Sequence, residues 1–393
     1  MRPAGKGRVA ESHEIARAAF LAALLFALIA VVWSVVVLIR GGSWWGPLHS
    51  FLAGTVLLAI SGASQMFTIT WSSTRPLSRR VTSTQRWLIL VGVAGVLAGV
   101  TLGLEVLTWA AGAAVAAGII VLAAIIRSSI RHSLLRRFDL SARFYLTAFT
   151  CGILGVTLGT VMGAGGGGAS YEKLRLAHAH LNLLGLVGLT IIGTIPTLLP
   201  TTAYSRAVTG VEGVWAWWLS LVGAGLMAVG IWAPRAVGAG ATLIAVAGAA
   251  IMVGIVARLW EKGRGKLAFL QIAIGSAWLI GWALVDGVSV LATGVMPHFD
   301  AWTAAAVVSG VGQVLAGSLA YLIPVLRGSP FDANRRIMEA RPWLPLILAN
   351  AGGLALGLGL GVTALVACGL FVTDFLSRVV IVGLRRPVAE PPG

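Results

Sequence analysis

The chain has 393 residues, of which 58% are apolar and only 11% are charged. Because an ordinary soluble domain carries about 25% charged residues, this composition excludes that class as well as a disordered chain. The net charge of +16 does not indicate a nucleic-acid-binding protein, because the basic residues lie in short clusters between long apolar stretches, as in loops at a membrane surface. The composition predicts a polytopic membrane protein with no soluble domain.

Apolar stretches of about 20 residues, the length of a membrane-crossing helix, occur twelve times. The first follows a polar tail, residues 1–17, and is interpreted as a retained anchor and not as a cleaved signal peptide. We predict an all-α bundle of twelve transmembrane helices over residues 18–384, followed by a disordered tail over residues 385–393. The predicted spans are 18–39, 48–71, 87–108, 110–127, 144–163, 179–200, 213–233, 236–257, 267–292, 302–326, 343–361 and 362–383.

Basic residues fall almost entirely on one side of these spans. If the N-terminus is cytoplasmic, the outer side keeps only four of the 29 Lys and Arg residues, which are Arg40, Lys173, Arg175 and Arg235. Since loops rich in Lys and Arg stay on the cytoplasmic side, we predict that both termini are cytoplasmic. The predicted location is a bacterial plasma membrane.

Four of the six histidines are predicted at the outer membrane face. His49 begins the second predicted span, His178 and His180 begin the sixth, and His298 lies just before the tenth. Imidazole is a ligand of haem iron, copper and zinc, and rings at one depth can converge in a bundle. The pattern therefore favours a metal or haem site, with the alternative that each ring is interfacial and merely hydrogen-bonded.

The spacing of His178 and His180 restricts how they can act together. Residues i and i+2 of a regular helix point about 200° apart, so these two rings can hold one metal only at a frayed first turn. Otherwise each ring serves a different partner. Asn182 shares a helix face with His178, four residues along, and could orient its ring.

Polar residues inside the predicted spans are further candidates, because their burial in lipid is costly. Asp286 lies well inside the ninth span, Gln313 midway along the tenth, and Glu105 near the outer end of the third. We predict that one of them carries a proton path, against the alternative that a neighbouring helix satisfies each side chain. A separate pair is expected between Asp374 and Arg378 at i+4.

Glycines recur at helix-packing spacing in the third predicted span. Gly92, Gly95, Gly99 and Gly103 are expected to let two helix backbones approach closely. The boundary between the third and fourth spans is placed between Thr108 and residue 110.

Three stretches resemble a haem-copper-oxidase-like membrane family. They are HSFLAG from His49, LAHAHLNLLGLVGLTIIGT from Leu176, and QVLAGSLAYLIP from Gln313. Within that family, the chain is similar to the NnrS-type proteins linked to nitric oxide stress, and more specifically to the membrane portion that precedes actinobacterial copper nitrite reductase domains. The resemblance implies an oxidase subunit I-like bundle with haem and copper ligands in its outer half, at His49, His178 and His180 and more loosely at His298. The seventh predicted span lacks the histidines of oxidases, so an oxygen-reducing binuclear centre is not expected.

We therefore predict an integral membrane protein that binds haem, copper or both and acts in electron transfer or in nitric oxide and copper handling. His49 and His298 are predicted to hold one metal or haem, and His178 and His180 a second metal or the opposite axial position. The expected partners are the lipid bilayer and a redox protein or quinol. Two alternatives stay open, a metal-free transporter with Asp286 in its pathway and a structural subunit of a larger complex.

Overall fold

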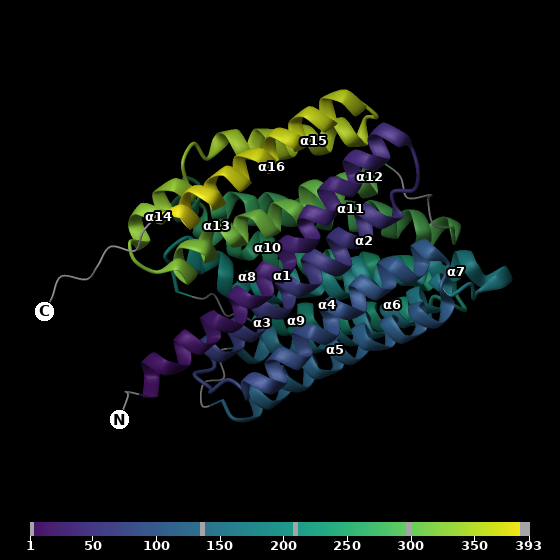
Figure 1. Ribbon diagram of the computed structural model, residues 1–393, viewed down its shortest axis with the longest axis horizontal. Coiled ribbons are helices and arrows are strands. Elements are labelled where there is room, and N and C mark those ends of the chain that lie inside the picture. Colours follow the sequence, from purple (N-terminus) through teal and green to yellow (C-terminus); the bar gives the residue numbers. More distant parts are fainter. Residues whose placement is uncertain (1–3, 134–137, 207–210, 296–300, 386–393) are drawn as a thin grey trace, which may run out of the picture. The chain divides into compact units, whose positions relative to one another are not determined.

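The described residues of the chain form helices and the turns between them. The computed structural model describes residues 4–133, 138–206, 211–295 and 301–385, and this part contains no strand (Figure 1). Within it, ten helices are long and apolar enough to cross a membrane, and two shorter apolar helices, Gly213–Val229 and Trp343–Gly357, accompany them. The prediction of an all-helical, multi-pass membrane protein is confirmed at this level.

In the first half of the chain, two spans change from α-helical to π-helical winding and back again. Its elements are α1 (Ala4–Arg40), α2 (Trp45–His49), η1 (Ser50–Val56), α3 (Leu57–Trp71), α4 (Arg79–Leu102), α5 (Glu105–Arg131), α6 (Asp139–Gly163), η3 (Gly168–Ser170), α7 (Tyr171–His180), η4 (Leu181–Gly188) and α8 (Leu189–Thr202). The segments η1 and η4 are π-helical and η3 is a 3-10 turn.

The second half repeats this winding change once, at η5, which is π-helical. Its elements are α9 (Val211–Val229), α10 (Pro234–Gly263), α11 (Leu267–Thr293), α12 (Ala301–Ala305), η5 (Ala306–Gly312), α13 (Gln313–Arg327), α14 (Phe331–Met338), α15 (Trp343–Gly357) and α16 (Gly361–Leu384).

The chain divides into two compact units. Unit 1 comprises Met1–Gly193, Trp217–Ile244 and Ser289–Val295, and unit 2 comprises Thr194–Ala216, Ala245–Val288 and Met296–Gly393. Unit 1 therefore holds α1 to α7 with the sixth-span histidines, and unit 2 holds α12 to α16.

Small residues set the distance between α4 and α5 in unit 1. A Cβ added at Gly92 would lie 2.7 Å from Cγ2 of Val115, and one added at Gly95 would lie 2.7 Å from Cβ of Ala111. The two helix backbones are thus as close as glycine allows, as the glycine spacing predicts.

Gly103 has a different role from the one expected. Its φ of 67° is left-handed and it ends α4, with open space where a Cβ would be, so it is a helix terminator and not a packing glycine. The boundary predicted at residues 108–110 is therefore wrong, because α5 begins at Glu105.

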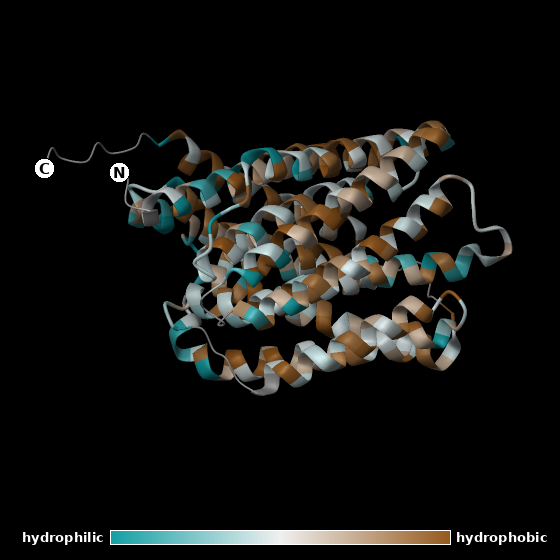
Figure 2. Cartoon of the chain, turned by 90° about the horizontal axis from the view of Figure 1, so that it is seen from below, coloured by the Kyte–Doolittle hydropathy of each residue, from teal (hydrophilic) through white to brown (hydrophobic). Residues whose placement is uncertain are grey.

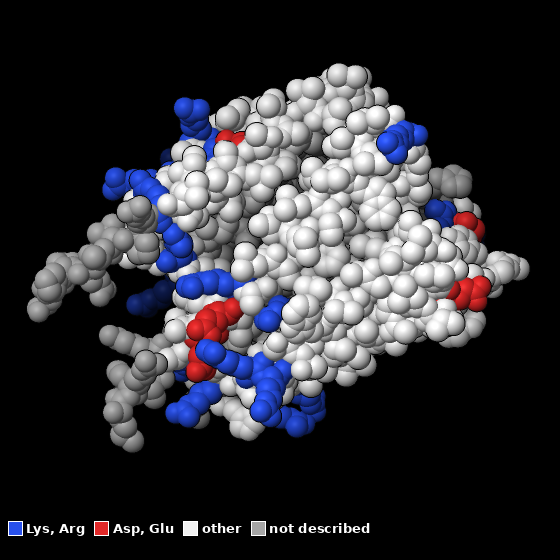
Figure 3. Space-filling model, viewed as in Figure 1, with Lys and Arg blue, Asp and Glu red and all other residues white. Residues whose placement is uncertain are grey.

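Basic segments meet at one end of unit 1. Arg8 at the start of α1 donates to the carbonyl of Ser73 at 2.7 Å, and Arg79 at the start of α4 pairs with Glu14 of α1 at 2.6 Å. The basic stretches at the N-terminus and at the start of α4 thereby share one end of the unit. On the face drawn in Figure 3, the Lys and Arg side chains stand in groups and wide areas carry no charge.

One end of unit 2 is held by charged and aromatic groups. Arg378 pairs with Asp374 at 2.8 Å, which confirms the predicted i+4 pair. Arg335 donates to the hydroxyl of Tyr204 at 2.6 Å, while Lys266 lies 3.8 Å above the centre of the same ring. Burial raises the pKa of the nearby Glu339 carboxyl, and Arg335 and Lys266 partly oppose this rise.

Large apolar side chains cover the outside of the helices. On α1, Leu21, Val32 and Ile39 are 69%, 63% and 77% exposed. Figure 2 shows hydrophobic residues running along the helices. An apolar surface this extensive is favourable in contact with the lipids of a bilayer and unfavourable in water.

Candidate functional site

The three π-helical segments mark the helices that are best shielded from lipid. Of the ten apolar helices in the described residues, those over Trp45–Trp71, Gly168–Thr202 and Ala301–Arg327 have the most buried apolar windows, at 83%, 89% and 61%. Each of the three contains one π segment. Because π segments are frequently found at functional sites, these three helices are the first place to look for one.

The first histidine of the site comes directly before the π segment η1. His49 is the last residue of α2, which begins at Trp45, three residues earlier than the predicted span. Its Nδ1 lies 2.8 Å from the carbonyl oxygen of Trp45, and the two rings stack with centroids 4.4 Å apart. Both contacts come from one helical turn, so the local sequence fixes the orientation of the His49 ring.

The second histidine lies three residues before the π segment η4. His178 was expected at a helix start, but α7 begins at Tyr171, so His178 and His180 lie in its last turn. The expectation of a frayed first turn is therefore wrong. Nδ1 of His178 lies 2.8 Å from the carbonyl oxygen of Gly155 on α6.

Asn182 also contacts His178. Its amide nitrogen donates to the carbonyl of His178 at 2.8 Å and lies 3.2 Å from Nδ1 of the ring. Since the carbonyl of Gly155 can only accept, we assign the Nδ1 proton of His178 to that bond. Asn182 thus lies beside the ring, as the helical spacing suggests.

Two glycines of α6 make room for these side chains. A Cβ at Gly155 would lie 2.7 Å from Cγ of Asn182, and one at Gly159 would lie 2.7 Å from Nδ1 of His178. Any larger residue at either position would push His178 or Asn182 away. Sequence reasoning missed both glycines, although their spacing of four residues was a usable signal.

His49 and His178 face each other across unit 1. Their ring centroids are 6.1 Å apart and their planes differ by 17°. In each ring Nδ1 lies against a backbone carbonyl, which leaves Nε2 of a neutral ring unprotonated and able to bind a metal. The two histidines belong to different helices and are 129 residues apart in the sequence.

Of the other two histidines predicted for the site, only His180 lies among the described residues. His180 is fully buried, and its Nδ1 lies 2.9 Å from the carbonyl oxygen of Leu176. His298 lies outside the described residues, so its predicted partnership with His49 stays a prediction. The described residues contain no group of three or more His, Cys, Asp or Glu side chains arranged to hold a metal ion.

The predicted proton-path residues belong to three different helices, α5, α11 and α13. Glu105 is exposed and is the first residue of α5, not a residue near the end of the third span. Asp286 is 7% exposed within α11 and belongs to unit 2. Neither is placed in the imidazole pair.

Gln313 belongs to a buried polar network in unit 2, directly after η5. It donates to the carbonyl of Ser309 at 2.9 Å and accepts from Asn350 at 3.3 Å. The side-chain oxygen of Asn350 in turn accepts from the indole of Trp278 at 2.7 Å. The network links α11, η5–α13 and α15. It corresponds to the alternative given from the sequence for Gln313, in which a neighbouring helix satisfies the polar side chain.

The chain was compared with protein-family models and with curated proteins. No family model matches the chain, and no curated protein matches it either.

Proposed function

We propose that His49 and His178 bind one metal centre, a haem iron or a copper ion, and that the chain acts in electron transfer or in nitric oxide or copper handling in a bacterial plasma membrane. The observation that carries the proposal is the near-parallel imidazole pair with ring centroids 6.1 Å apart. The resemblance of both helices to the haem-copper-oxidase-like family points the same way.

The separation of the rings fits a shared metal. Ring centres 6.1 Å apart leave space for one ion about 2 Å from a nitrogen of each imidazole, provided that both Nε2 atoms turn toward it. A pair of imidazoles is also a complete set of protein ligands for a haem iron, which takes its remaining ligands from the macrocycle. For these reasons, haem is the first candidate and copper the second.

The surrounding residues prepare both rings for this role. The carbonyls of Trp45 and Gly155 fix which nitrogen carries the proton, and Asn182 lies against the His178 ring. Stacking of Trp45 covers one ring with an apolar surface. Such a centre, when bound, supplies reversible one-electron transfer.

The test is an absorption spectrum and an elemental analysis of the full chain purified in detergent after expression with added haem precursor and copper. A haem absorption band or copper at one equivalent per chain is the expected result. His49→Ala and His178→Ala should each remove it, because one imidazole leaves the centre half-bound.

His132→Ala is the matched control. Its Nδ1 lies 2.8 Å from the carbonyl oxygen of Ser128, the same contact that His49 makes, but at an exposed site outside the pair. The signal should survive in this variant. A wild-type chain without haem or copper, or a signal that persists in both pair variants, would contradict the proposal.

A further inference from the structure

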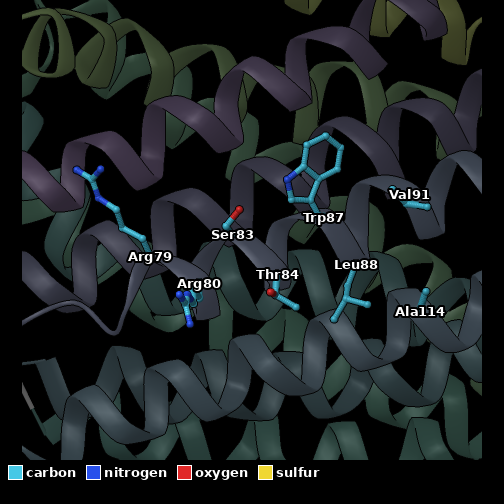
Figure 4. A pocket seen from close by; sticks show the side chains of 8 residues that line it. All are labelled: Arg79, Arg80, Ser83, Thr84, Trp87, Leu88, Val91 and Ala114. Atoms are coloured by element: carbon cyan, nitrogen blue, oxygen red, sulfur yellow. The ribbon is translucent and has the colours of Figure 1, made fainter.

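A groove of about 770 Å³ runs along one face of α4 in unit 1. Figure 4 shows its lining side chains. They are Arg79, Arg80, Ser83, Thr84, Trp87, Leu88 and Val91 on α4, together with Ala114 on α5. The α4 residues repeat at three- and four-residue steps, so they form a continuous stripe on the helix.

The chemistry of the stripe changes in order from one end to the other. Two guanidinium groups stand at the start of α4, two hydroxyl groups follow, and then come an indole and aliphatic side chains (Figure 4). This is the order of groups in a phospholipid from phosphate through glycerol esters to acyl chain. A tryptophan in the middle of the series lies where aromatic residues gather at a membrane interface.

The length of the stripe matches one leaflet. Arg79 to Val91 covers twelve helical steps, or about 18 Å. One leaflet has about 15 Å of hydrocarbon and a headgroup layer of about 5–7 Å. A groove of this length takes a headgroup and much of one chain, whereas a free phosphate would use only its first turn.

The charge at the headgroup end is positive. Arg79 pairs with Glu14, but Arg80 is exposed and forms no ion pair or hydrogen bond among the described residues. Arg86, one turn further along, lies 3.5 Å from the hydroxyl oxygen of Ser83 and adds a third positive charge. Three guanidinium groups thus line or border this end of the groove and only Arg79 is paired with a carboxylate, a balance that suits an anionic headgroup and not a zwitterionic one.

We propose that this groove is a binding site for an anionic phospholipid, with the phosphate at Arg79 and Arg80, the glycerol region at Ser83 and Thr84, and one acyl chain along Trp87, Leu88, Val91 and Ala114. The bound lipid covers the outside of the α4–α5 pair. The site is independent of the imidazole pair and of any metal bound there.

Native mass spectrometry of the delipidated full chain tests the site. Phosphatidylglycerol and phosphatidylcholine with identical chains are titrated separately, and bound lipid is counted per chain. We expect phosphatidylglycerol to be retained preferentially, and Arg80→Gln to weaken its retention about five-fold, the effect of one basic residue at an anionic surface. Millimolar glycerol phosphate should not displace the lipid, because it lacks the chain.

Two further variants make the outcome decisive. Arg127→Gln on α5 removes an exposed arginine outside the groove and should leave lipid retention unchanged. Ala114→Phe fills the apolar part and should weaken retention of both lipids. Equal retention of the two lipids, equal loss in Arg80→Gln and Arg127→Gln, or displacement by glycerol phosphate would each overturn the site.

Discussion

At the scale of single residues, Gly159 controls whether His178 can reach His49. A methyl group there would meet Cε1 of the His178 ring and lie 2.7 Å from Nδ1. We predict that Gly159→Ala displaces the ring, removes most of the haem or copper signal and costs about 1–3 kcal/mol of stability, as overpacking does. The absorption spectrum and a thermal melt of the purified variant measure both effects.

Gly225→Ala is the matched control for that change. Gly225 lies in α9, within unit 1, and has open space where a Cβ would be. Its replacement should leave the spectrum unchanged and the melting temperature equal or slightly higher, because alanine favours helix over glycine. Full retention of the signal in Gly159→Ala would show that the His178 position is not critical.

The sequence reveals the candidate residues better than their partners. His49 and His178 can be found because imidazoles are rare in apolar stretches near a membrane face. Their pairing cannot be found in this way, since it depends on which helices are neighbours and on how each helix is rotated. The backbone carbonyl of Gly155 is invisible to any residue pattern, although it orients the His178 ring.

At the scale of helices, the π segment η1 determines which face of α3 turns inward. A π segment holds an extra residue, and removing one residue rotates everything after it by about 100°. We predict that deleting Ala53 keeps the helix content but turns the buried side chains of α3, including Gln65 and Thr68, out of the core. Circular dichroism should remain helical while the melting temperature and the metal signal fall sharply.

Deleting Gly42, in the exposed connection before α2, is the control for a shortened chain. This change leaves the winding after His49 intact, so the spectrum should survive. If the Ala53 deletion keeps both its spectrum and its stability, η1 does not set the register of α3.

Helix positions follow from apolar length, but helix ends do not. Gly103 reads from sequence as one more packing glycine because Gly92, Gly95 and Gly99 precede it at regular steps. Only its left-handed φ distinguishes a terminator from a packing residue. Likewise, α7 begins eight residues before the predicted span. Its first two turns are polar, so apolar length alone does not include them in the helix.

At the scale of the whole molecule, the distribution of basic residues predicts which ends face the cytoplasm. Ser78, between α3 and α4, is expected inside, and Ser170, before α7, is expected outside; both are exposed. We predict that a membrane-impermeant maleimide labels Ser170→Cys in intact cells and labels Ser78→Cys only after lysis. The two native cysteines lie within helices, and Cys151 is buried. Labelling of the parent chain measures the background that these two thiols contribute. The reverse labelling pattern would invert the topology.

Composition and charge are sufficient to predict a multi-pass helical membrane protein and the approximate positions of its spans, because the length of an apolar stretch is a local property of the sequence. The division into two units was not predictable, since it rests on contacts between distant segments such as α12 and α15. An oxidase-like arrangement stays a prediction for the same reason.

The helices differ in length, and this has a consequence for the surrounding membrane. The 37 residues of α1 reach about 55 Å, whereas the 15 residues of α15 reach only about 22 Å. Hydrocarbon about 30 Å thick cannot be matched by the shorter helix, so lipids beside α15 must compress or the helix must draw polar headgroups inward. The bilayer is therefore expected to be thinner beside α15 than beside the longer helices.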